Sequence, residues 1–373
     1  MGAKDTRAPD DWTGAPDTMR LEHEIVELKT RYVFNIARMK GDFVRRCVHV
    51  RLIDDDGVEG WGEAPVSTPY YGETADTVSA VLPLLRDAAS SFQLPASSDD
   101  VSEATRKIAA IESAIDRAIG YNRGAKVAIS SALHDLAGKR LGQPVWRMWQ
   151  LDARAPRSSY TIAIAEPDEM AARAKEAASF PILKIKIGTD RDAAMLRAIR
   201  DARADAEIKV DANTAWTVEQ AIAKLPMLEE VGVTLLEQPL HPDDVDGLAR
   251  VREESSIPVY ADESCITLRD VHRLAGRVDG INIKLAKCGS LLEARRMVDA
   301  ARAYGMNVML GCMVETSLGI AAGIQLAPLM DHLDLDGALL LANDPIDGPG
   351  VERDGTLRFN DESGLGCRPK AVD

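Results

Sequence analysis

The sequence predicts an α/β protein that combines a (β/α)8 barrel with a smaller α+β domain, and three observations support this. The chain has 373 residues, which is long for one ordinary domain but suits a large barrel with an accessory domain. Eight short β-like segments recur in its second part at nearly even intervals. Before them, residues 19–122 show strand-like segments followed by helical ones, which is a different order of elements.

The smaller domain is predicted from two kinds of hydrophobic period. Residues 20–65 contain alternating segments, and the acidic turn 54–57 followed by VEGWGEAPV is typical of a hairpin. Residues 73–120 instead place apolar side chains at helical spacing. The Gly/Pro-rich end of the chain predicts loops and a hairpin that return to this domain. The resulting division is a polar tail (1–18), the α+β domain (19–122), the barrel domain (123–345) and a C-terminal segment (346–373).

The barrel is predicted from the number and spacing of its β-like segments. They begin at residues 158, 182, 207, 233, 257, 280, 307 and 332, so that successive starts lie 23 to 27 residues apart. Each interval fits one βα unit, and eight such units close this type of barrel. A doubly wound open sheet is disfavoured because no GxGxxG motif follows a strand. Residues 124–149 are expected to form a helix that leads into the barrel.

Composition excludes several classes of partner. The 45 basic and 59 acidic residues give a net charge of −14, which argues against a nucleic-acid surface. No apolar run reaches the roughly 20 residues of a membrane helix, and the first residues lack the apolar core of a secretion signal. The 5 cysteines are widely spaced and include no CxxC pair, as expected in a reducing compartment. We therefore expect a cytoplasmic protein that binds neither membrane nor nucleic acid.

Three carboxylates stand at equivalent places in the predicted barrel. Asp211, Glu237 and Asp262 each end an apolar strand, and they are 26 and 25 residues apart. The carboxyl ends of the strands form the face that carries the active site in such barrels. Converging carboxylates repel one another and are costly to bury unless a cation joins them, and an all-oxygen set suits Mg²⁺. We therefore predict one Mg²⁺ per subunit, against the alternative of solvated loop carboxylates or partners for lysines.

Lysines lie on both sides of the predicted metal site. Lys186 ends strand 2, Lys284 ends strand 6, and Lys184 shares the inward face of strand 2 with Lys186. A substrate between these strands would present one carbon to two amines, which suits removal of a proton from one face and delivery to the other. Simple ion pairs with the carboxylates, or a Schiff-base lysine, are the alternatives. Lys209 and Lys287 are expected to lie off the site.

Several motifs in this pattern resemble one known family. Lys-x-Lys on strand 2, VDAN, LLEQP, ADES and NIKLAKCGS are similar to the strand ends of the enolase superfamily, in its muconate-lactonising subgroup. GWGEAPVSTPYYGET resembles the family's capping-domain segment, so the likeness covers nearly the whole chain. Asp334-x-Asp336 on strand 8, with GCMVETSLGIAA on strand 7, resembles the dipeptide epimerases, typified by the L-Ala-D/L-Glu epimerases. The resemblance implies a modified TIM barrel under a capping domain built from both ends of the chain.

The resemblance also implies a role for each site residue. Mg²⁺ on the three carboxylates would hold the carboxylate of a dipeptide and stabilise the enediolate formed when its C-terminal residue loses the α-proton. Lys186 and Lys284 would be the two acid/base catalysts, and Lys184 would support the substrate carboxylate. Asp334 and Asp336 would bind the α-ammonium, unless they are helix caps or solvated loop residues. The remaining positions are Thr161, Cys312, Met313 and Val314, which would line the pocket, and Asn213 and Glu263, which would orient ligands.

The identity of the second residue of the dipeptide follows less directly from the sequence. The loop near FNIARMKGDF is expected to close over the barrel mouth. Its cations Arg38 and Lys40 favour an acidic side chain, unless both are ordinary surface charges or Phe34, Tyr70 and Tyr71 line an apolar pocket instead. The competing activities are o-succinylbenzoate synthase, N-acylamino acid racemase and muconate cycloisomerase, whose substrates lack a free α-ammonium. A barrel without catalytic activity is the remaining alternative. We expect a homo-oligomer that acts on a small dipeptide.

Overall fold

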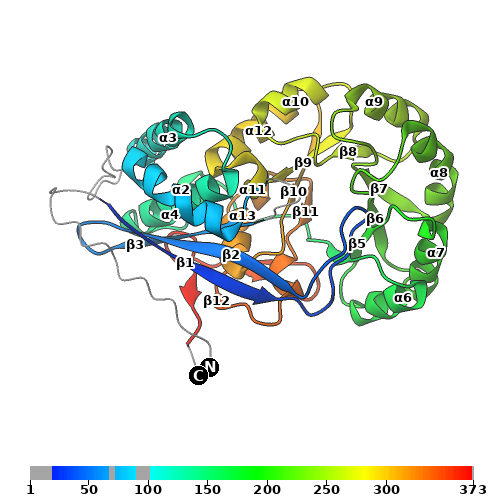
Figure 1. Cartoon of the computed structure of the whole chain (residues 1–373), viewed down its shortest axis with the longest axis horizontal. Coiled ribbons are helices and arrows are strands. Elements are labelled where there is room, and N and C mark those ends of the chain that lie inside the picture. Colours follow the sequence, from blue (N-terminus) through cyan, green and yellow to red (C-terminus); the bar gives the residue numbers. More distant parts are fainter. Residues whose placement is uncertain (1–18, 67–71, 90–100, 372–373) are drawn as a thin grey trace.

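The computed structural model describes residues 19–66, 72–89 and 101–371, and the predicted polar tail lies outside them, as do Tyr70 and Tyr71. The smaller part comprises β1 (Arg20–Lys29), β2 (Val44–Ile53), β3 (Glu59–Pro65), α2 (Ala75–Ala89), α3 (Val101–Ala118) and α4 (Arg123–Arg140). The three strands form an antiparallel sheet with β2 in the centre, and α2 and α4 pack against it (Figure 1). The predicted hairpin is β2–β3, and the predicted strand and helical regions are confirmed.

α4 lies unusually close to the sheet. Residues 124–138 of this helix are all buried. Gly60 and Gly62 on β3 permit the close approach, because a Cβ at either position would overlap with the carbonyl oxygen of Ala132 or Ala128 on α4. The GWG part of the hairpin motif therefore has a packing role.

The larger part is a parallel barrel whose eight strands run in the order β4 to β11. Ser158 forms a parallel bridge with Leu333, and the Ser159 N–H donates to the Leu333 carbonyl at 3.0 Å, which joins the first strand to the last. The predicted strands are confirmed, since each begins within 2 residues of its expected start. Their bounds are β4 (Tyr160–Ile162), β5 (Ile182–Lys186), β6 (Glu207–Asp211), β7 (Val233–Glu237), β8 (Val259–Ala261), β9 (Gly280–Lys284), β10 (Asn307–Gly311) and β11 (His332–Asp334).

Helices surround the barrel on its outer side (Figure 1). α8 shows the local signals, because Thr217 and Gln220 form a capping box at its start and Gly232 ends it with a φ of 75°. None of the described helices has the length and apolarity needed to cross a membrane. The helices are α5 (Val145–Met148), α6 (Pro167–Glu176), α7 (Asp192–Ala202), α8 (Val218–Val231), α9 (Val245–Glu254), α10 (Leu268–Leu274), α11 (Leu285–Cys288), α12 (Leu291–Ala303), α13 (Ser317–Ile324), η1 (Ala327–Leu329) and η2 (Gly337–Leu340).

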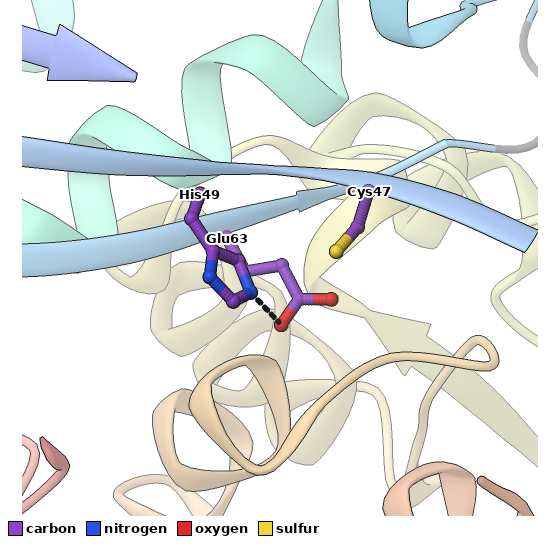
Figure 2. A group of neighbouring side chains, drawn as sticks. All are labelled: Cys47, His49 and Glu63. Carbon is purple, nitrogen blue, oxygen red and sulfur yellow. Dashed lines mark ion pairs between the residues drawn. The ribbon is translucent and has the colours of Figure 1, made fainter. Parts of the chain in front are cut away.

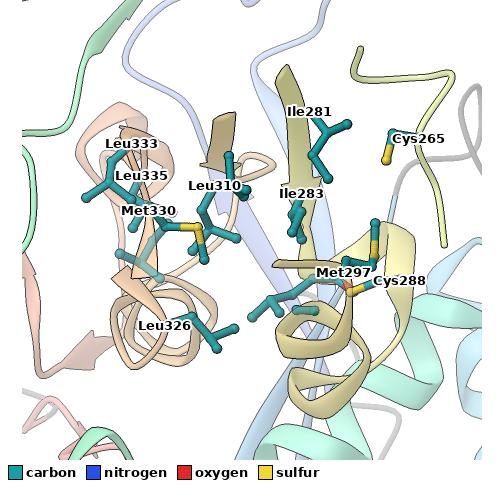
Figure 3. Close-up of a cluster of buried hydrophobic side chains, with 14 of the residues drawn as sticks. Cys265, Ile281, Ile283, Cys288, Met297, Leu310, Leu326, Met330, Leu333 and Leu335 are labelled. Carbon is teal, nitrogen blue, oxygen red and sulfur yellow. The ribbon is translucent and has the colours of Figure 1, made fainter. Parts of the chain in front are cut away.

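Apolar side chains fill the layer between the strands and the outer helices. Ile281 and Ile283 on β9 belong to the same buried cluster as Met297 on α12 (Figure 3). Asn282 and Lys284 alternate with these isoleucines along β9 and therefore face the barrel interior. This alternation leaves polar side chains inside the barrel at the carboxyl ends of its strands.

The C-terminal segment forms two short antiparallel pairs. They are β12 (Ile346–Asp347) with β15 (Arg368–Pro369) and β13 (Gly350–Val351) with β14 (Leu357–Arg358). Asp135 on α4 accepts the Leu365 N–H at 2.7 Å and the Trp61 N–H of β3 at 2.8 Å, and so links this segment to the small sheet. The predicted domain boundaries stay a prediction, because α4 also contacts α11 on the barrel side.

Candidate active site

Three carboxylates converge at the carboxyl end of the barrel. Asp211 and Glu237 are the last residues of β6 and β7 and pair in register, and Asp262 directly follows β8. All three are at most 1% exposed, and each contributes an oxygen atom to a group within 4.8 Å of one another. A hard divalent cation such as Mg²⁺ prefers an all-oxygen donor set of this kind. The chemistry of these donors therefore fits the predicted Mg²⁺ site.

Lysine side chains surround the carboxylates. Lys186 Nζ donates to the carboxylate at the end of β6 at 2.6 Å, and Lys284 Nζ donates to the carboxylate after β8 at 2.7 Å. Lys184 Nζ lies 2.7 Å from Glu237 and 3.3 Å from Asp211. The structure thus brings the predicted lysines and carboxylates together, with Lys186 and Lys284 on two sides. Because these ion pairs already compensate the carboxylates, the case for a metal rests on their convergence and not on uncompensated charge.

Lys287 also belongs to this group, and the prediction that it lies off the site was wrong. It is fully buried in α11, and its Nζ is 2.6 Å from Asp262 Oδ1 and 2.7 Å from the Asn282 carbonyl. The prediction applied strand alternation to a residue that lies in a helix, where the period is different. Lys209 contacts His332 on β11 instead, at 3.1 Å.

Burial and the neighbouring charges together shift the pKa values of these carboxyl groups in opposite directions. Burial would raise the pKa of Asp262, but Lys284 and Lys287 outweigh it and hold that pKa well below its usual range. Burial, followed by repulsion from Asp211, raises the pKa of Glu237 to about 7. A bound cation would favour the ionised form of all three carboxyl groups. Neighbouring carboxyl groups with opposed shifts are typical of a functional site.

The two predicted orienting residues lie beside the predicted metal ligands. The Asn213 N–H donates to Asp211 Oδ1 at 2.9 Å, and its side-chain amide donates to Glu263 Oε1 at 3.2 Å. Asn213 has a φ of 44°, in the left-handed region that non-glycine residues seldom adopt. Such backbone strain persists where the surroundings fix a residue for a function.

Two further orienting residues were missed by the sequence analysis. Asn282 Nδ2 donates to Glu237 Oε1 at 2.7 Å, and Gln238 Oε1 accepts the Asp262 N–H at 2.9 Å. Signals for both existed. Asn282 shares the inward alternation of Lys284 on β9, and Gln238 directly follows a predicted ligand inside an apolar segment.

The aspartate pair predicted to bind an ammonium lies at the end of β11. Asp334 Oδ1 accepts from the Ser159 hydroxyl at 2.7 Å, and Asp336 Oδ2 accepts from the Thr161 N–H at 2.6 Å. Lys184 Nζ lies 2.8 Å from Asp334 Oδ2, so the pair is connected to the three converging carboxylates. Thr161 thus lies where it was predicted, and Ser159 is an addition that the sequence analysis missed.

The two aspartates differ in the pKa of their carboxyl groups. Burial, and then repulsion from Asp334, raises the pKa of Asp336 to about 7. Lys184 more than offsets the effect of burial on Asp334 and lowers its pKa to about 2. One carboxylate of the pair is therefore neutralised by a lysine, while the other would gain from a cationic ligand such as an ammonium group.

A cavity of about 90 Å³ connects these groups beneath the small sheet. Its floor contains Thr161, Lys186, Lys284 and the aspartate pair, and residues 312–314 after β10 line it as predicted. The remaining lining residues, which we call the roof, are Phe34, Ile36, Met39, Arg45, Val66 and Leu340.

The predicted specificity residues Arg38 and Lys40 do not line this cavity. They face a wider neighbouring groove of about 800 Å³. Arg38 Nη2 donates to Glu263 Oε1 at 2.9 Å. The cation that the structure places in the roof is Arg45, which the sequence analysis did not single out.

A second group of possible metal ligands lies between the small sheet and the barrel. Cys47 and His49 on β2 and Glu63 on β3 point to one another, with His49 Nε2 3.7 Å from Glu63 Oε2 (Figure 2). Glu63 also accepts the N–H of Thr316 at 3.1 Å and that of Gly319 at 3.2 Å, at the start of α13. Because these contacts engage the Glu63 carboxylate, we interpret the group as a helix cap that joins the sheet to the barrel.

The chain matches known proteins along most of its length. Residues 26–149 match the mandelate racemase / muconate lactonizing enzyme N-terminal domain, and residues 168–372 match the enolase C-terminal domain-like family. An L-Ala-D/L-amino acid epimerase from Maribacter sp. is 38% identical over 349 residues, covering 93% of this chain and 98% of the relative.

Solved structures give the same picture. The L-Ala-D/L-Glu epimerase from Bacillus subtilis, solved as a substrate-liganded complex, matches this chain with a TM-score of 0.87 at 30% sequence identity. The match covers 95% of this chain and 99% of the epimerase chain. A dipeptide epimerase from Enterococcus faecalis V583, complexed with Mg and the dipeptide L-Leu-L-Tyr, has a TM-score of 0.85 at 30% identity. That match covers 94% of this chain and 99% of the other.

Proposed function

Because this chain belongs to the mandelate racemase / muconate lactonizing enzyme family, we propose that it is a Mg²⁺-dependent dipeptide epimerase. It inverts the α-carbon of the C-terminal residue of a dipeptide. The observation that carries the proposal is one cavity that holds both Lys186 and Lys284, placed on two sides of a carboxylate trio, together with the Asp334 and Asp336 pair.

Lys186 and Lys284 move the proton. They enter from β5 and β9, and the strands that carry the metal ligands lie between them. One lysine takes the α-proton as a neutral amine while the other donates a proton as an ammonium group, and the roles exchange for the reverse reaction. Bound Mg²⁺ supplies positive charge at the substrate carboxylate, which makes the α-proton easier to remove.

Lys184 and the aspartate pair hold the charged ends of the dipeptide. Burial opposes the charge on Lys184, but the carboxylates around it, Asp334 first, raise its pKa well above the usual value and keep it cationic. It therefore supports the substrate carboxylate. Asp336 is available for the α-ammonium, so that both ends are fixed and the C-terminal α-carbon lies between the two proton-transfer lysines.

Deuterium uptake tests this function. A small library of L-L and L-D dipeptides is incubated with the enzyme in D₂O containing Mg²⁺, and mass spectrometry locates the label. We expect uptake at the α-carbon of the C-terminal residue, interconversion of the two diastereomers, and loss of both with EDTA. Absence of exchange in every dipeptide, or exchange that persists in EDTA, would contradict the proposal.

The competing activities are separated by the ammonium group. Asp334→Asn with Asp336→Asn should raise the KM for dipeptides by roughly 100-fold or more, because the charge-assisted contact of Asp336 and the negative charge of Asp334 beside it are both lost. N-acylamino acids, which lack the ammonium, serve as the parallel substrates. If the wild type prefers them, or if the double variant turns over dipeptides normally, the aspartate pair does not bind an ammonium and an N-acylamino acid racemase becomes the better assignment.

A further inference from the structure

A cation of the cavity roof has no place in the mechanism above. Arg45 is the second residue of β2 and pairs across the sheet with Leu28. Alternation along β2 puts its side chain on the same face as Cys47 and His49, which is the face toward the barrel. Cys47 packs with Leu28 and Leu341 beneath the sheet, which fixes this orientation. Arg45 therefore enters the cavity from the end of a buried row of side chains.

The hydrogen bonds of Arg45 are incomplete. Nη1 donates to the Val44 carbonyl at 3.0 Å, whereas Nη2 is buried and has no hydrogen-bond partner among the residues that the structure describes. Burial lowers the pKa of Arg45, against the attraction of Asp42. A buried N–H of a charged group is costly without an acceptor, and an anionic ligand would supply one. The other roof residues are the apolar Phe34, Ile36, Met39, Val66 and Leu340.

The proposed mechanism already assigns a role to each of the other charged groups of the cavity. Lys186 and Lys284 face the α-carbon, and the aspartate pair faces the ammonium group of the substrate. Arg38, which the sequence analysis favoured for recognition of an acidic side chain, is bound to Glu263 and does not line the cavity. Within the described part of the chain, Arg45 is therefore the cavity cation that remains for a substrate side chain.

We propose that Arg45 selects dipeptides whose C-terminal residue carries a carboxylate side chain, as glutamate and aspartate do. This inference rests on the proposed epimerase function and names the substrate class of the same cavity. An apolar roof with one guanidinium group fits a side chain of methylene groups that ends in an anion, and a guanidinium group prefers a carboxylate to an amide of the same shape. Structural relatives include an L-Ala-D/L-Glu epimerase and an enzyme solved with L-Leu-L-Tyr, so the family alone does not decide the class.

The test compares an acidic dipeptide with an uncharged analogue of the same shape. We measure kcat and KM for L-Ala-L-Glu, L-Ala-L-Gln and L-Ala-L-Leu with the Mg²⁺-loaded enzyme. The wild type should prefer L-Ala-L-Glu over L-Ala-L-Gln by roughly 10- to 100-fold in kcat/KM, the range expected for one charged contact. Arg45→Met should remove this preference, mainly through a higher KM for L-Ala-L-Glu, because the lost contact is present throughout the reaction. Arg45→Lys should restore part of it.

Neighbouring arginines provide the controls. Arg46→Met changes the next residue of β2, which is exposed on the opposite face of the sheet, and should leave the preference unchanged. A wild type that turns over L-Ala-L-Gln or L-Ala-L-Leu as well as L-Ala-L-Glu overturns the inference but leaves the epimerase intact. A preference that survives Arg45→Met and disappears in Arg38→Met also overturns it and returns the role to Arg38. Exchange with no dipeptide at all would instead remove the proposed function.

Discussion

At the scale of single residues, the site is a set of lysines matched to carboxylates on neighbouring strands. Lys186 is paired with Asp211, whereas Lys284 shares Asp262 with Lys287. The two lysines to which we assign the proton transfer therefore lie on different strands and are held by different carboxylates. If each lysine serves one face of the α-carbon, the two are not interchangeable. Removal of the α-proton from the L and from the D configuration then depends on different lysines.

This asymmetry gives a prediction for the two alanine variants. Lys186→Ala and Lys284→Ala should each lower the rate of epimerisation roughly 10²- to 10⁴-fold, the usual contribution of a general acid or base. Each variant should still exchange the α-proton of the one diastereomer whose proton faces the remaining lysine. Deuterium uptake, measured separately on an L-L and an L-D substrate, checks this, with Lys224→Ala on the outer helix α8 as the control. Full turnover in both variants, or exchange of the same diastereomer by both, would refute the two-base mechanism.

The residue scale also shows where sequence interpretation succeeds. Lys184 and Lys186 lie on a strand, so alternation correctly placed them on one inward face. The same rule failed for Lys287 because this residue lies in a helix directly after its strand. Arg45 was missed for another reason. Its strand belongs to the small sheet, and only the packing of that sheet over the barrel brings Arg45 to the cavity.

At the scale of elements, α13 joins the small sheet to the wall of the cavity. Glu63 on β3 accepts the N–H groups of Thr316 and Gly319 and also the Thr316 hydroxyl. The positive end of a helix dipole favours a carboxylate there. Residues 312–314, which line the cavity, precede this helix start by only a few residues. One carboxylate thus fixes the wall of the cavity relative to the sheet above it.

Replacement of this carboxylate should therefore affect stability. Glu63→Gln removes the charge and turns an amide N–H₂ toward buried donors, so we expect the free energy of unfolding to fall by about 1–3 kcal/mol. Urea unfolding followed by circular dichroism measures it. Glu24→Gln is the matched control, because that side chain is 69% exposed and lies 4.0 Å from the other side of His49. Unchanged stability of Glu63→Gln would contradict the cap, and stabilisation of the wild type by Zn²⁺ that is lost in Cys47→Ala would favour a metal site instead.

At the scale of the whole molecule, the barrel could be predicted from the sequence more completely than its junction with the smaller part. Each βα unit is a local repeat, so the count and order of the strands followed from spacing alone. The junction depends on single polar atoms inside α4. The Ser130 hydroxyl donates to Glu112 Oε1 on α3 at 2.6 Å and accepts the Leu291 N–H of α12 at 3.1 Å, so three helices from both parts meet there. The spacing of apolar residues in the sequence does not predict a polar contact of this kind.

Glu112 makes the stability of the whole chain depend on pH. Burial raises its pKa from the ordinary value of 4.5 to about 7, although Ser130 opposes this. Between these two pH values the folded protein keeps a proton that the unfolded chain has released. The contribution of Glu112 to stability is therefore fully present below pH 4.5 and is lost as the pH rises through 7. At 1.36 kcal/mol for each pKa unit, the full loss approaches about 3 kcal/mol.

Glu112→Gln removes this titration and keeps an oxygen for the Ser130 hydroxyl. The buried amide has its own cost, but that cost does not vary with pH, so the informative quantity is the change between two pH values. We expect the stability of the variant relative to the wild type to improve by about 1–3 kcal/mol between pH 5 and pH 8 in urea unfolding. Glu103→Gln, in the partly exposed pair with Lys107 on the same helix, controls for the loss of a negative charge. A difference that stays constant with pH would show that folded Glu112 is already ionised at pH 5, and that the junction of the three helices tolerates a buried charge.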